Sequence, residues 1–154
     1  TAYRRQRQMC IRDSIGAVVA HGKAATVLQP GNHGSTFGGN PLAMRAGIET
    51  IRIMEEDGLL AHTTKVGDHL KATLQKELAD VKGVVDVRGQ GLIIGIELNK
   101  PCGALLGRGA EAGLLFSVTA DTVVRLVPPL IMTEAEADEV VAKLKPLIVQ
   151  FLSE

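Results

Sequence analysis

The sequence changes from helical to strand-like spacing in the segment Val84-Val85-Asp86-Val87-Arg88-Gly89-Gln90-Gly91-Leu92-Ile93-Ile94-Gly95-Ile96-Glu97-Leu98. We expect two strands, over residues 84–88 and 92–98, because short apolar runs on both sides of a glycine-containing turn are typical of a β-hairpin. The turn is expected around Gly89-Gln90-Gly91. Lys100-Pro101 is expected to end the second strand.

The chain after this hairpin continues with a helix, two more strands and a last helix. Residues 105–112 are expected to form a short helix that ends at Gly113. Residues 114–119 and 122–127 are expected to be strands joined around Ala120-Asp121. The order strand-strand-helix-strand-strand-helix predicts an α+β subdomain.

The last helix has a start signal and an interruption. Thr133, with Glu136 three residues later, is the pattern of a capping box. Pro146 falls inside the helical pattern and is expected to kink or split the helix, because proline removes a backbone hydrogen bond. The expected apolar face consists of Val140, Leu144, Ile148 and Phe151 or Leu152.

Two longer helices and one strand are expected before the hairpin. The helices cover residues 41–57, with Gly58 just beyond the end, and residues 59–80, closed by Gly83. The apolar run 15–20 is expected to be a buried strand. The apolar positions of the two helices are Leu42, Ala46, Ile51 and Met54, then Leu59, Thr63, Val66, Leu70, Leu74 and Leu78.

A glycine-rich loop leads into the first of these helices, with the sequence Gly31-Asn32-His33-Gly34-Ser35-Thr36-Phe37-Gly38-Gly39-Asn40-Pro41-Leu42-Ala43. Asn40 suits the N-cap, and Pro41 suits the first helical position. Glycines, two hydroxyls and a helix N-terminus together favour binding of an anion such as a phosphate. On spacing alone, the alternative is an ordinary capped helix after a loop.

Three segments resemble the class III aminotransferases of the ornithine and acetylornithine type, which use pyridoxal 5'-phosphate. They are His33–Ala43, Val87–Leu98 and Val124-Arg125-Leu126-Val127-Pro128-Pro129-Leu130, in the family's order. The acetylornithine branch is the most similar. The resemblance implies an α+β C-terminal small domain over residues 58–154. Over residues 15–57 it implies a remnant of the α/β large domain of a fold-type I pyridoxal-phosphate-dependent transferase.

The resemblance also implies roles for three residues of this chain. Thr36 would contact the cofactor phosphate of the neighbouring subunit, and Ser35 would lie against the substrate, so the protein would be a homodimer with a shared active site. The alternative for both hydroxyls is a turn or helix start. Arg125 would clamp a substrate carboxylate, or pair with an acidic residue until substrate arrives. The alternative for Arg125 is an arginine on a surface strand that has no binding role. Arg88 is expected to have a structural role.

Residues 1–14 differ from the rest of the chain. They carry four arginines against one aspartate and show no helical or strand period. A nucleic-acid or targeting arm and a disordered tail are two interpretations. The resemblance favours a third, because the family has here a glycine-rich stretch that opens with the Schiff-base lysine, and Arg7 occupies the position of that lysine. We expect foreign sequence joined at about Ser14/Ile15, and a chain that is inactive as printed.

The activity implied by the resemblance is transfer of the δ-amino group of N-acetylornithine to 2-oxoglutarate, in arginine biosynthesis. Alternative amino donors within the family are ornithine, succinylornithine, 4-aminobutyrate or a related ω-amine, and an aminomutase shares the same motifs. In a different class, the chain would be a non-catalytic α+β ligand-binding or interaction module.

Composition limits the partners further. Basic and acidic residues number 17 each, so the net charge indicates no nucleic-acid partner. No apolar run approaches the roughly 20 residues of a membrane span. Cys10 and Cys102 have no metal-ligand spacing and are expected to be free thiols of a cytoplasmic protein, with Cys102 inert. His62 and His69 are expected to be solvent-exposed, and no metal site is expected.

Overall fold

The structure is a computed structural model that describes residues 21–27, 29, 34 and 38–154. The expectations for residues 1–14, for the strand at residues 15–20, and for Ser35 and Thr36 lie outside this part of the chain. The chain divides into two compact units, Thr1–Asp57 and Gly58–Glu154.

The first unit contains a 3-10 helix, η1 (Gly22–Thr26), and the α-helix α2 (Pro41–Glu56). The start of α2 is as predicted, because the side chain of Asn40 accepts a hydrogen bond from the Ala43 N–H at 2.9 Å. Gly58, with φ +62°, follows the helix in the expected C′ position. The expected apolar positions stay largely exposed, since Ala43 is the buried residue of this helix.

The second unit begins with α3 (Leu59–Leu78), which ends two residues before the predicted end. Its buried side is the predicted one, and consists of Val66, Gly67, Leu70, Leu74 and Leu78. At Gly67 the helix touches the turn of the first hairpin, because a Cβ there would lie 2.2 Å from the carbonyl oxygen of Gly91. Only glycine permits this approach.

Four strands form one antiparallel sheet in the order β1-β2-β4-β3. Their bounds are β1 (Val84–Gln90), β2 (Ile93–Leu98), β3 (Ser117–Thr119) and β4 (Val123–Leu126). The first turn was predicted too early. The pair Gln90↔Ile93 leaves Gly91 and Leu92 as the turn, because Gly91 takes the positive φ (+53°) and Leu92 is buried at the hairpin tip.

The second hairpin differs from its prediction in strand length. Residues 114–116 are not part of β3, because the pairing with β4 begins at Ser117. Before it lies α4 (Leu105–Glu111), which is followed by Gly113 with φ +76°, as predicted. The turn does contain Ala120 and Asp121, and both have positive φ.

The last helix, α5 (Glu134–Ser153), starts with the predicted capping box of Thr133 and Glu136. Of the two effects expected of Pro146, a kink or a split, the split does not occur, because α5 is continuous through this residue. Pro146 and Ala142, whose carbonyl loses its usual partner, are both exposed, so water can hydrate that carbonyl. The predicted apolar face is confirmed, because Leu144, Ile148 and Phe151 are buried and Val140 is partly buried against the core. The fully buried side also includes Ala137 and Val141, which were not predicted.

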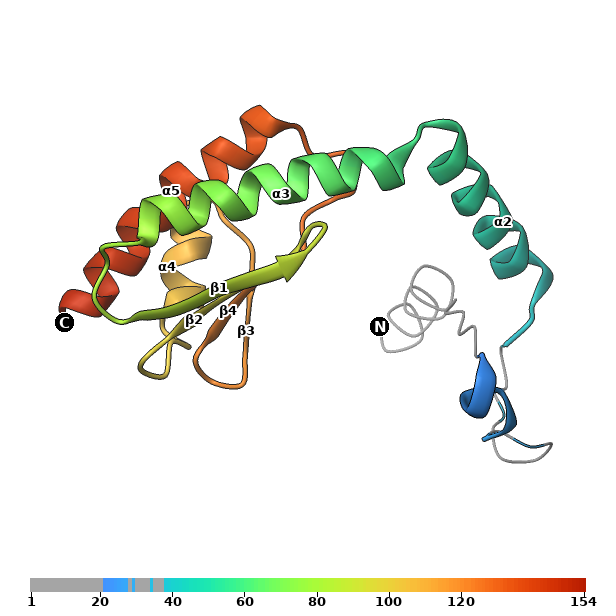
Figure 1. The fold of residues 1–154 in the computed structure, drawn as a ribbon, viewed down its shortest axis with the longest axis horizontal. Coiled ribbons are helices and arrows are strands. Elements are labelled where there is room, and N and C mark those ends of the chain that lie inside the picture. Colours follow the sequence, from blue (N-terminus) through green and yellow to red (C-terminus); the bar gives the residue numbers. More distant parts are fainter. Residues whose placement is uncertain (1–20, 28, 30–33, 35–37) are drawn as a thin grey trace, which may run out of the picture. The chain divides into compact units, whose positions relative to one another are not determined.

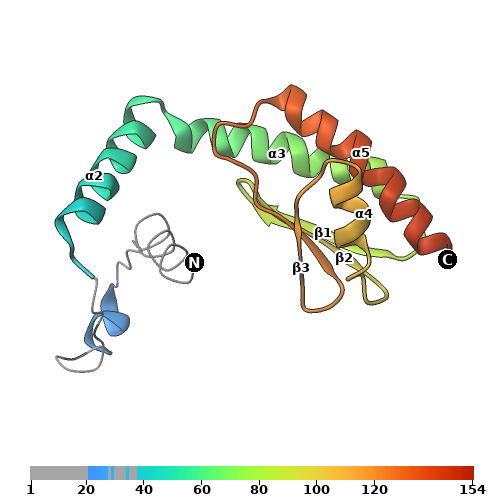
Figure 2. The same cartoon turned by 180° about the vertical axis from the view of Figure 1, so that it is seen from behind.

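The helices of the second unit lie over one face of the sheet. α3 and α5 run side by side in the same direction above the strands (Figure 1). Seen from behind, α4 lies beneath the C-terminal half of α5 (Figure 2). An ion pair at 2.7 Å links Arg108 of α4 to Glu154, the residue that follows α5. The core between the layers is aliphatic, with Leu70, Ile96 and Leu144 completely buried.

The other face of the sheet is not covered by any element of this unit. Burial alternates along β2 and β4, with Ile94, Ile96 and Val124 buried and the residues between them more exposed. The exposed face carries polar and charged side chains, including that of Arg125. None of the helices that the structure describes is long and apolar enough to cross a membrane.

Candidate functional site

Arg125 lies on β4, in register with Gly95 of β2 on one side and Ser117 of β3 on the other. Its side chain is on the uncovered face, because its neighbours Val124 and Leu126 point into the core. Two prolines follow the strand end, and neither can donate a hydrogen bond to a continued ladder. The predicted position of Arg125, at a strand end before the proline pair, is confirmed.

The guanidinium of Arg125 is held at one nitrogen. Its Nε donates a hydrogen bond to the Oγ of Ser117 at 3.0 Å. Arg125 makes no ion pair within the described residues. The other two arginines of residues 58–154 do have carboxylate partners, in the pairs Arg88–Asp86, Arg88–Glu97 and Arg108–Glu154. Among the residues that the structure describes, none occupies the terminal Nη1 and Nη2 groups of Arg125, which can therefore bind a carboxylate.

Arg88 is held inside the sheet, in agreement with the structural role expected for it. Its Nη1 donates to Glu97 on β2 at 2.5 Å and to Asp86 on β1 at 3.0 Å. Both hydrogen bonds raise the pKa of Arg88, and the bond to Glu97 has the larger effect. The ion pair with Glu97 links the two strands of the first hairpin, whereas the pair with Asp86 lies within β1.

The start of α2 has the features of an anion site as far as the structure describes it. Gly39 has φ +77°, and a Cβ at Gly34 or Gly39 would meet no atom of the described residues within 4 Å. α2 is 16 residues long, and its N-terminus carries a partial positive charge. These features fit the phosphate group of pyridoxal phosphate. The predicted phosphate ligand Thr36 and its neighbour Ser35 lie outside the described residues.

The prediction that His62 and His69 are solvent-exposed is wrong. Both are partly buried, because they lie on the side of α3 that faces α5. Nε2 of His62 donates to the carbonyl oxygen of Met132 at 2.8 Å, and Nε2 of His69 contacts Oδ1 of Asp138 at 2.7 Å. Their partners are about 70 residues away in sequence, so helix spacing alone could not reveal these contacts.

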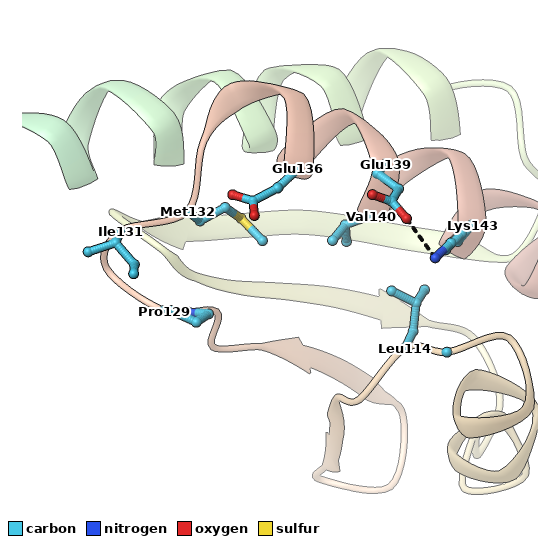
Figure 3. A pocket seen from close by; sticks show the side chains of 9 residues that line it. Leu114, Pro129, Ile131, Met132, Glu136, Glu139, Val140 and Lys143 are labelled. Carbon is cyan, nitrogen blue, oxygen red and sulfur yellow. Dashed lines mark ion pairs between the residues drawn. The ribbon is translucent and has the colours of Figure 1, made fainter.

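The sequence did not indicate a cavity of about 310 Å³ between α5 and the segment that follows β4 (Figure 3). Met132 and Val140 project into it opposite Leu114, and the Glu139–Lys143 ion pair at 2.7 Å lies at its edge. A second cavity of about 220 Å³ shares these three apolar residues. Arg125 lines neither cavity, so both are separate from the free guanidinium.

The cysteine thiol and the metal-ligating side chains of the described residues form no further reactive site. Cys102 is a free and fully buried thiol, and burial raises its pKa, which lowers the fraction of reactive thiolate. The thiol therefore has the inert character that was predicted. No cluster of His, Cys, Asp and Glu within the described part of the chain is arranged to hold a metal ion.

Comparison with known proteins gives relatives that agree with the motifs. Acetylornithine aminotransferase 1 of Bordetella bronchiseptica is 56% identical over 140 residues, which are 91% of this chain and 36% of that protein. Acetylornithine aminotransferase of Nitrosomonas europaea is 46% identical over 138 residues, 90% of this chain and 35% of that protein. The chain thus spans about a third of the length of the curated relatives it matches.

Solved structures agree with the fold. The ornithine δ-aminotransferase of Plasmodium falciparum is 35% identical with a TM-score of 0.73, over 84% of this chain and 33% of that chain. The acetylornithine aminotransferase of Elizabethkingia anophelis is 31% identical with a TM-score of 0.70, over 82% and 34% respectively. These neighbours confirm the α+β domain of a fold-type I transferase. Because the sequence model of the class III aminotransferases also matches residues 14–148, the chain belongs to that family.

Proposed function

We propose that the protein containing this chain transfers the δ-amino group of N-acetylornithine to 2-oxoglutarate, in arginine biosynthesis, with pyridoxal 5'-phosphate as cofactor. The names of the relatives support the amino donor. The observation that carries the proposal is Arg125, the arginine of residues 58–154 without a carboxylate partner within the described residues. Both substrates carry the carboxylate that such a guanidinium binds.

In this proposal, three residues of the chain and one helix N-terminus bind the cofactor or the substrate. Pyridoxal phosphate supplies the electron sink for the reaction when it is bound. Thr36 and the N-terminus of α2 hold its phosphate, and the phosphate belongs to the neighbouring subunit's site in a homodimer. Ser35 lies against the substrate. Arg125 binds the substrate carboxylate through two parallel hydrogen bonds and so orients the amino group.

The chain by itself is proposed to be inactive. Arg7 stands where the family has the lysine that holds the cofactor covalently, and an arginine does not release the proton that this role requires. Residues 1–13 lie outside the range matched by the family model, which supports their proposed foreign origin. We assign residues 15–57 to the cofactor-binding large domain and residues 58–154 to the small domain, and we place the protein in the cytoplasm.

A chimeric enzyme tests the proposal. Residues 15–154 replace the matched segment of the Bordetella bronchiseptica enzyme. The rest of that enzyme would supply the Schiff-base lysine that this chain is proposed to lack. We expect transamination of N-acetylornithine with 2-oxoglutarate, while the 154-residue chain alone shows none. A chimera that folds and binds pyridoxal phosphate but does not use N-acetylornithine would contradict the proposed substrate.

Arg125→Ala in this chimera is the sharper test. We expect the KM for the carboxylate substrates to rise about 10- to 100-fold, because a charged, two-pronged hydrogen bond is lost. Arg125→Lys should recover only part of the loss, since lysine keeps the charge but not the fork. Arg88→Ala is the matched control, because Arg88 lies on the same face of the sheet but is already paired. Equal KM values for the two alanine variants would contradict the role of Arg125.

Ornithine is the second candidate for the amino donor. The ornithine aminotransferase of Staphylococcus carnosus is 40% identical over 131 residues, and the similar Plasmodium falciparum structure is that of an ornithine δ-aminotransferase. Comparing kcat/KM for N-acetylornithine, ornithine and 4-aminobutyrate in the chimera separates these donors.

A further inference from the structure

The Ser117 hydroxyl lies on the strand next to Arg125 and contacts the guanidinium directly. We propose that Ser117 is a positioning residue, which occupies Nε of Arg125 and leaves only the Nη1–Nη2 end of the guanidinium for a substrate carboxylate. This inference rests on the proposed function, in which Arg125 binds that carboxylate. It adds a residue outside the three motifs and a defined binding geometry.

The register of the sheet explains why these two side chains meet. Ser117 and Arg125 are a direct cross-strand pair of β3 and β4, so their side chains leave the sheet on the same face. The Arg125 Nε–H reaches the Ser117 Oγ at 3.0 Å. The other cross-strand neighbour of Arg125 is Gly95, which has no side chain. Ser117 is therefore the polar side chain directly opposite Arg125.

The contact restricts how a carboxylate can bind. A guanidinium offers two edges with paired N–H groups: the side edge, formed by Nε and one Nη, and the end, formed by Nη1 and Nη2. The hydrogen bond to Ser117 uses the single Nε–H, so the side edge has lost one of its two donors. A carboxylate that forms two parallel hydrogen bonds must bind at the end, opposite Nε.

The hydroxyl also limits the freedom of a long and exposed side chain. Arg125 is exposed, and a free arginine loses rotamer entropy when it binds a ligand. A guanidinium already held at Nε loses less of this entropy on binding. Removing the hydroxyl should therefore weaken binding of substrate without changing the chemical step, which appears as a higher KM at constant kcat.

The contact is first tested in the complete 154-residue chain, without substrate. NMR of the Arg125 Nε–H group measures its exchange with water in the unchanged chain and in Ser117→Ala. We expect about five-fold faster exchange in the variant, because a typical hydrogen bond is lost. Thr119→Ala is the matched control, since Thr119 lies on the same strand and face but pairs with Val123. Equal exchange in the unchanged chain and Ser117→Ala would overturn the contact.

The functional effect is tested in the chimera described above. Ser117→Ala should raise the KM for N-acetylornithine or 2-oxoglutarate about five-fold with kcat unchanged. Ser117→Thr, which keeps the hydroxyl and suits a strand, should restore the KM. Thr119→Ala should leave it unchanged.

A double variant decides whether Ser117 acts through Arg125. If it does, adding Ser117→Ala to Arg125→Ala should cause no further rise in KM. Additive effects, or no effect of Ser117→Ala alone while Arg125→Ala raises the KM, would overturn the positioning role. If Arg125→Ala itself has no effect on the KM, the proposed function fails instead, and the two failures are thereby distinguished.

Discussion

Gly67 of α3 lies against the turn of the first hairpin, where there is no room for a side chain. A Cβ at this residue would lie 2.2 Å from the carbonyl oxygen of Gly91 and 2.8 Å from its Cα. Both are backbone atoms, so no side-chain rotation can relieve the overlap. The approach of α3 to the tip of the first hairpin therefore requires glycine on the helix.

We predict that Gly67→Ala destabilises the fold by about 1–3 kcal/mol, because the overlap exceeds the gain of alanine in a helix. Gly107→Ala is the control, since Gly107 is also helical but a Cβ there meets nothing within 4 Å. It should be neutral or stabilising by up to about 1 kcal/mol. Urea unfolding of both variants gives the comparison, and similar effects would show that the close approach is unimportant.

Helix caps and helix-ending glycines could be predicted from the sequence where the interacting residues are close along the chain. The Asn40 cap, the box of Thr133 and Glu136, and Gly113 each depend on neighbours within a few positions, and each is confirmed. Ser117 was missed as a partner of Arg125, because their pairing depends on the three-residue connection between β3 and β4. The ligand roles of Ser35, Thr36 and Arg125 stay predictions.

Among the elements, α3 and α5 are joined along their length by polar contacts. Besides the two histidines, Lys65 pairs with Glu134 at 3.0 Å, and Glu77 with Lys145 at 2.7 Å. The hydrogen bond from Lys145 is the main cause that lowers the pKa of Glu77. Because this carboxyl is more acidic in the folded state, the pair stabilises the fold at neutral pH. That contribution is lost as the pH falls through the lowered pKa.

Lys145→Met should therefore make stability less sensitive to acid. We expect the variant to unfold more easily than the unchanged chain at about pH 7, and the difference to shrink at about pH 3, where Glu77 is protonated in both. Lys143→Met is the control, because Lys143 pairs within α5 with Glu139 and does not reach α3. Urea unfolding at both pH values measures the effect, and a difference that does not depend on pH would contradict it.

Element types were predicted more accurately than their contacts. The helices and strands of residues 41–154 follow the expected order, because apolar spacing and turn residues indicate them locally. The core-facing side of α5 is wider than predicted, since Val141 is buried and Val140 beside it is partly buried against the core. The first turn lies at Gly91 and Leu92, where Gly91 approaches Gly67 of α3 and Leu92 is buried, and the local pattern does not contain this tertiary contact.

At the scale of the whole molecule, the hydrophobic core that the structure describes lies in residues 58–154. Every member of the buried hydrophobic cluster lies in this range, from Val66 to Phe151. By contrast, α2 exposes large apolar side chains, among them Leu42, Ile48 and Ile51, each more than half exposed. An exposed apolar helix of this kind favours association with other surfaces.

A chain that begins at Gly58 should therefore keep a cooperative fold. We expect the same melting temperature as that of the C-terminal unit in the complete chain, and weaker binding of a hydrophobic dye, because α2 is removed. Thermal unfolding and dye fluorescence of the two chains measure this. Loss of a cooperative transition in the shorter chain would show that residues 1–57 contribute to the core.

The parallel pair of α3 and α5 also has a consequence for the order of folding. The two hairpins close over connections of two and three residues. By contrast, the hydrogen bonds that join α3 to α5 and to Met132 just before it connect positions 68 to 70 apart. Closing the longer loop costs more chain entropy, so local hairpins form first and α5 docks late. Until it docks, the apolar side of α3 faces water. The chain is therefore most prone to aggregation near the end of folding rather than at its beginning.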